Sequence, residues 1–68
     1  MTEILFIAEA AAEGGYIARA VGTSIFTDAD DLDQLRDAVS DSVRCHFEDG
    51  DRPKAIRRHL VHDEVIAA

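Results

Sequence analysis

The sequence predicts a small α+β domain with the order strand, strand, strand, helix, strand, in which one amphipathic helix packs on one face of an antiparallel sheet. Three observations support this fold class. Only in residues 30–47 do apolar side chains recur with helical spacing over a length sufficient for a helix. Short apolar runs separated by glycines precede that segment, and a further short apolar run follows a Gly-x-x-Pro turn signal. Because the chain has 68 residues and no internal repeat, we expect a single domain, residues 1–68.

The first strand is expected at residues 3–10, where apolar side chains fall on both sides of the extended chain. Ile4, Phe6 and Ala8 point one way, and Leu5 and Ile7 point the other. A strand that is apolar on both sides needs cover on both faces. Since the chain offers a single helix, we expect a second subunit to cover the other face.

Two glycine signals divide the next part of the chain into strands. Gly14 and Gly15 tolerate the positive φ angles of a tight hairpin, and residues 16–21 form the returning strand. Gly22 with Thr23 ends that strand, and residues 24–27 are expected to form a short third strand leading into the helix.

The helix is predicted over residues 30–47. Its apolar stripe consists of Leu32, Leu35, Val39, Val43 and His46. Asp33, Asp37 and Asp41 recur every four residues on the opposite side, which is therefore acidic. The carboxylates of residues 28–31 suit a helix N-terminus, and the Gly-x-x-Pro sequence at residues 50–53 suits its end.

The C-terminal segment, residues 54–68, carries weaker signals. We expect a fourth strand at residues 56–61, a turn or bulge at His62 and Asp63, and a short extended tail. A frayed terminal helix is the alternative.

Charge is unevenly distributed along the chain. The net charge is −7, and residues 28–51 alone hold nine acids against two arginines. Such a surface repels phosphate backbones and suits a basic protein partner, so no direct DNA binding is expected. We therefore predict that Asp33, Asp37 and Asp41 bind a partner. The alternative is a solvated acidic face that only keeps the protein soluble.

The remaining sequence features point to a cytoplasmic protein. A single cysteine cannot form an internal disulfide, and the first apolar run is too short to span a membrane. A domain of this size buries only about 60% of the surface of its unfolded chain, so we expect self-association.

No residue pattern specifies catalysis, a cofactor or a metal. Cys45 and His46 are neighbours, which do not face each other on a helix, so we expect a packed histidine and an inert cysteine. His59 and His62 would point to opposite faces of a strand, which argues against a shared metal ion. The basic residues Arg52, Lys54, Arg57 and Arg58 are expected to pair with the helix acids of the same or of a second subunit, with Arg57 and Arg58 on opposite faces.

The order of these motifs resembles the HicB-like antitoxin family. The Gly14-Gly15-Tyr16 hairpin and the run from Phe26 to Leu32, which leads into an amphipathic helix, are similar to that family over residues 4–47. The resemblance implies the β-β-β-α-β fold, a partial relative of the double-stranded-RNA-binding fold. It also implies a stand-alone N-terminal domain without the C-terminal DNA-binding module of complete antitoxins.

As a function, the resemblance implies a non-catalytic, homo-oligomeric interaction protein that binds and masks a small basic HicA-like ribonuclease toxin. One alternative is a homo-oligomer with a small-ligand site between subunits. A less favoured one is a subunit associated with a 2-oxo acid dehydrogenase, for which the sequence shows no diphosphate-binding motif.

Overall fold

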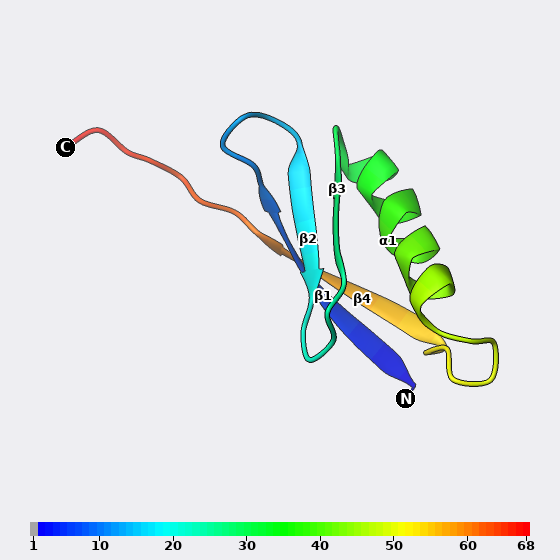
Figure 1. Cartoon of the computed structure of the whole chain (residues 1–68). Coiled ribbons are helices and arrows are strands. Elements are labelled where there is room, and N and C mark those ends of the chain that lie inside the picture. Colours follow the sequence, from blue (N-terminus) through cyan, green and yellow to red (C-terminus); the bar gives the residue numbers. More distant parts are fainter. Residues whose placement is uncertain (1) are drawn as a thin grey trace.

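The structure, a computed structural model, describes residues 2–68. Its elements follow the predicted order, which is confirmed (Figure 1). They are β1 (Glu3–Ala10), β2 (Tyr16–Ala20), β3 (Phe26–Ala29), α1 (Leu32–His46) and β4 (Ala55–Val61).

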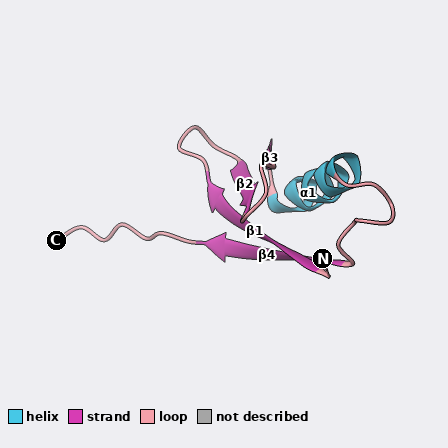
Figure 2. Cartoon of the chain, turned by 60° about the horizontal axis from the view of Figure 1, so that its bottom comes forward, coloured by secondary structure: helices cyan, strands magenta, loops and turns pink. Residues whose placement is uncertain are grey.

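The four strands form one mixed sheet in the order β3-β2-β1-β4. The pairs β1–β2 and β2–β3 are antiparallel, as predicted, but β4 lies parallel to β1, so the expectation of a wholly antiparallel sheet is wrong (Figure 2). The helix is the reason. After β3, α1 carries the chain back along the sheet, so β4 starts at the end where β1 and β3 start. Since β1 and β3 are the two edges of the three-stranded meander, a strand added at either edge runs parallel to its neighbour.

The β1–β2 hairpin depends on its glycines. Gly14 and Gly15 both have positive φ, at 103° and 75°, and the Ala11 N–H donates to the Gly15 carbonyl at 2.9 Å. Gly15 is also sterically required, because a Cβ there would lie 2.7 Å from the Ala29 carbonyl oxygen on β3. The turn therefore sets both the β1–β2 register and the approach of β3.

The core lies between α1 and one face of the sheet. Phe6 is fully buried at its centre, and alanines occupy the neighbouring positions, with Ala20 opposite Phe6 and Ala18 opposite Ala8. These small side chains let the helix approach the sheet closely. The buried residues are Ile4, Phe6, Ala8, Ala18, Ala20, Ile25, Leu35, Val39 and Val43. The helix packs mainly against β2 and β3, while β4 lies at the far edge of the sheet.

The helix begins and ends close to its predicted limits. Asp31 is the N-cap, and its carboxylate accepts a hydrogen bond of 2.7 Å from the Gln34 N–H. Leu35, Val39 and Val43 are buried as predicted, but His46 is exposed, so its assignment to the packed stripe is wrong. His46 lies in the last turn beside an open hollow, and Phe47, four residues after Val43, packs against the core instead.

The opposite face of the sheet is covered by no segment of residues 2–68. Leu5, Ile7 and Ile17 are only half buried there, and Phe26 is 66% exposed. We call this surface the open face. Its apolar character agrees with the two-sided pattern of β1, and its cover by a second subunit stays a prediction.

The tail after β4, residues 62–68, continues without the predicted turn and forms no helix, which excludes the frayed-helix alternative. In both views it leads away from the helix and from the rest of the sheet (Figures 1 and 2). Val65 and Ile66 are 97% and 77% exposed. The tail thus presents apolar side chains that its own domain does not cover.

Replacing Gly15 by alanine tests the hairpin. We expect Gly15→Ala to lower the free energy of unfolding by about 2–3 kcal/mol, because strain at positive φ adds to the collision with Ala29. Gly14→Ala is the matched control, with positive φ but open space around the new Cβ, and should cost about 1 kcal/mol. Urea unfolding measures both. Equal losses would contradict the steric role of Gly15.

Removing the N-cap tests the helix start. Asp31→Ala should destabilise the domain by about 1 kcal/mol, because the Gln34 N–H loses its acceptor. Asp33→Ala removes the same charge from the same helix end without removing a cap and should cost only a few tenths of a kcal/mol. Thermal unfolding compares the two, and a larger loss for Asp33→Ala would assign the effect to charge alone.

Candidate interaction surfaces

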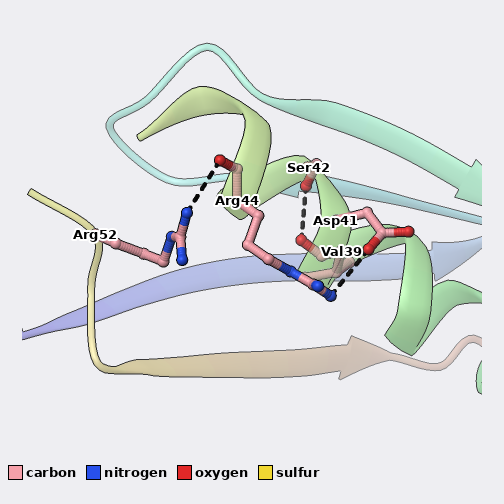
Figure 3. Close-up of polar contacts among 5 residues, drawn as sticks. All are labelled: Val39, Asp41, Ser42, Arg44 and Arg52. Atoms are coloured by element: carbon pink, nitrogen blue, oxygen red, sulfur yellow. Dashed lines mark hydrogen bonds and ion pairs between the residues drawn. The ribbon is translucent and has the colours of Figure 1, made fainter. Parts of the chain in front are cut away.

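The acidic helix surface, which we define as Asp33, Asp37 and Asp41, lies where the sequence predicts it. All three residues are exposed on α1, away from the buried side chains. Only Asp41 forms an ion pair within residues 2–68, with Arg44 at 2.9 Å (Figure 3). An exposed pair of this kind is worth less than about 1 kcal/mol, so a partner can displace it at little cost.

A groove of opposite charge lies between α1 and the start of β4. It has a volume of about 560 Å³ and is open to solvent. Its basic lining residues are Arg36, Arg44, Arg52, Lys54 and Arg58. These are five of the seven basic residues of the whole chain, and no acidic side chain lines the groove. The apolar part of the lining comes from Val39, Val43, Pro53 and Ile56. We call this site the cationic groove.

Three elements hold the groove's arginines in place. Arg58 on β4 donates to the Leu32 carbonyl of α1 at 2.8 Å, which links the edge strand to the helix start. Arg52, in the loop between α1 and β4, donates to the Arg44 carbonyl at 3.4 Å (Figure 3) and pairs with Asp49 at 3.0 Å. The Nε of Arg52 is buried and has no hydrogen-bond partner in the described chain.

Within residues 2–68 of one subunit the basic cluster does not pair with the helix acids, so that part of the expectation is wrong, and pairing with the acids of a second subunit stays a prediction. Arg57 pairs with Glu3 across the β1–β4 ladder, Arg52 pairs with Asp49, and Arg58 binds a backbone carbonyl. Arg57 and Arg58 do lie on opposite faces, as predicted: consecutive strand residues alternate, and only Arg58 lines the groove on the helix side.

Sequence reasoning missed the groove because its two halves are distant along the chain. The one local signal was the spacing of Arg36, Ser40 and Arg44, which places them on one side of α1. Nothing in that spacing shows that residues 52–58 return beside it.

The remaining candidate residues do not converge. Cys45 and His46 are both exposed, and the His46 ring makes an edge contact with Phe47, with centroids 4.9 Å apart. His59 lies in β4, while His62 lies beyond it. Within residues 2–68, no three histidine, cysteine or carboxylate side chains are grouped so as to hold a metal ion.

Nor does the described part of the chain contain a helix of the length and apolar character needed to cross a membrane. Helix α1 has 15 residues, and three of them are hydrophobic and buried.

Comparison with known proteins gives two close relatives. A UPF0150 protein from Archaeoglobus fulgidus is 51% identical over 51 residues, which cover 75% of this chain and 76% of the relative. A UPF0150 protein from Thermotoga maritima is 42% identical over 65 residues, which cover 96% of this chain and 91% of the relative. No family model and no solved structure matches the chain. At this identity and coverage, the chain belongs to the UPF0150 protein family.

Proposed function

We propose that this chain is a non-catalytic interaction protein of the HicB-like antitoxin type, a homo-oligomer that binds and masks a small basic ribonuclease toxin. The acidic helix surface is the observation that carries the proposal. It is exposed and carries one weak ion pair, at Asp41, within the described residues. The resemblance over residues 4–47 supplies the kind of partner.

The charge distribution supports a basic protein as the partner. Residues 28–51 contain nine acids and two arginines, and both of those arginines line the cationic groove. Asp33 and Asp37 are left without an ion pair in residues 2–68. A surface segregated in this way attracts a basic partner at long range and repels acidic competitors.

The open face supports self-association. Exposed or half-buried apolar side chains lie on it from all four strands, namely Leu5, Ile7, Ile17, Phe26 and Val61. Apolar side chains left on one face in this way are typical of an interface, because a monomer would leave them in contact with water. Self-association through the open face leaves the acidic helix surface, on the other side of the sheet, free for the toxin.

Phe26 tests self-association. We expect light scattering at micromolar concentration to show a dimer or larger oligomer, and Phe26→Glu to lower the mass of that assembly, because a charge would then be buried in the interface. Gln34→Glu adds the same charge on exposed α1 and should leave the mass unchanged. A wild-type monomer, or an assembly indifferent to Phe26→Glu, would refute this part of the proposal.

Charge reversal tests partner binding. The tagged protein is used to recover, from a low-salt lysate of its source, a stoichiometric small basic protein with ribonuclease activity, whose affinity is then measured by calorimetry. Asp33→Lys with Asp37→Lys should weaken binding by about tenfold or more and flatten its salt dependence, since two unpaired carboxylates become cations.

The matched control for partner binding is Glu9→Lys with Glu13→Lys. These residues are also exposed, and their reversal changes the net charge equally but lies away from α1. Affinity should change by no more than about twofold, because distant exposed charges are screened. Equal weakening by both pairs of substitutions would mean that net charge alone attracts the partner.

A further inference from the structure

We propose that the cationic groove binds the C-terminal tail of a second copy of this chain. Antiparallel pairing of the two β4 strands brings the tail to the groove. This rests on the self-association in the proposed function and specifies a contact that the open face does not involve. Each copy gives its tail and receives the other's.

The groove requires an occupant that is both acidic and apolar. Its lining includes five cations and four apolar side chains. Of the five cations of the groove, only Arg44 and Arg52 form ion pairs within residues 2–68. Arg36, Lys54 and Arg58 have no carboxylate partner there. The buried Arg52 Nε also lacks an acceptor. An incoming carboxylate would relieve the repulsion among these cations and supply acceptors.

The tail has that composition. Asp63 and Glu64 precede the exposed residues Val65 and Ile66. The groove of the same chain lies at the start of β4, and the tail leaves from its end and leads away from the helix in both views (Figures 1 and 2). The tail therefore approaches a groove without a reversal of the chain only if that groove belongs to another copy.

Antiparallel β4 pairing gives the required geometry. The outer edge of β4 is unpaired, because β1 occupies its other side and β4 is last in the sheet. When two such strands run antiparallel, the residues after Val61 of one copy lie beside the residues before Ala55 of the other. Those residues, Arg52 to Lys54, line the groove. One two-fold axis fills both grooves and removes both exposed edges.

Side-chain alternation selects which tail residues enter. Ile56 and Arg58 line the groove, so the even-numbered positions of β4 face the helix side. If the tail continues the strand, Glu64 and Ile66 lie on that same side. Each groove then receives one carboxylate and one apolar side chain, which match the basic and the apolar residues of its lining. A nucleic acid offers no apolar side chain, and the net charge of −7 opposes its approach.

Zero-length carbodiimide crosslinking tests the proposal on the full chain, because Lys54 is the only lysine and lies in the groove. A mixture of unlabelled and ¹⁵N-labelled protein is crosslinked, digested and read by mass spectrometry. We expect Lys54 joined to Asp63 or Glu64 in pairs that combine one light and one heavy chain. Lys54→Arg keeps the charge but removes the primary amine, so it should abolish the crosslink.

The variant Asp63→Asn with Glu64→Gln should remove the crosslink and raise the dissociation constant of the assembly by about tenfold, as expected for lost interfacial charge pairs. An oligomer without a Lys54–tail crosslink, or crosslinks within one chain only, would overturn the tail exchange and leave the proposed self-association intact. Saturable binding of an RNA oligonucleotide that Lys54→Glu abolishes, with no tail crosslink, would overturn it in favour of a nucleic-acid site. A protein that is monomeric by light scattering at every concentration would overturn the self-association itself.

Discussion

The whole structure depends on one packing constraint, which is that a single 15-residue helix must cover a four-stranded sheet. Leu35, Val39 and Val43 satisfy it by packing onto Phe6 and the alanines of β1 and β2. That contact buries one face over β1, β2 and β3 but does not extend to β4. The cationic groove beside β4 and the open face behind the sheet are both consequences of this incomplete cover.

The elements themselves were predictable from the sequence because their signals are local. The spacing of Leu35, Val39 and Val43 defines the buried side of α1, and Gly15 marks a turn that a larger residue would block. The periodicity wrongly placed His46 on the buried side of α1. Its direction around the helix axis fits the apolar stripe, but at this residue the helix extends beyond the core. The parallel β1–β4 pairing was missed because periodicity says nothing about which neighbour a strand chooses.

The same distinction between local and distant signals separates the two charged surfaces. Asp33, Asp37 and Asp41 lie on one helix, so their common exposure follows from spacing alone. The cationic groove exists only because β4 skips past β2 to pair with β1, which brings Arg52 and Arg58 beside Arg36. A chain with an acidic composition therefore contains a basic site that neither its net charge nor any linear motif indicates.

The pairing of β1 with β4 also bears on how the chain is made. β1 is a central strand of the sheet, and its neighbour on one side is β4, the last strand of the fold, with Glu3 beside Ala55. During synthesis the β1–β2 hairpin can close early, whereas the other edge of β1 stays unpaired until β4, which follows α1, has been made. Such long-range pairing slows folding and leaves an apolar strand open to association in the meantime. The nascent chain is therefore exposed to association through this edge of β1 until β4 has been synthesised.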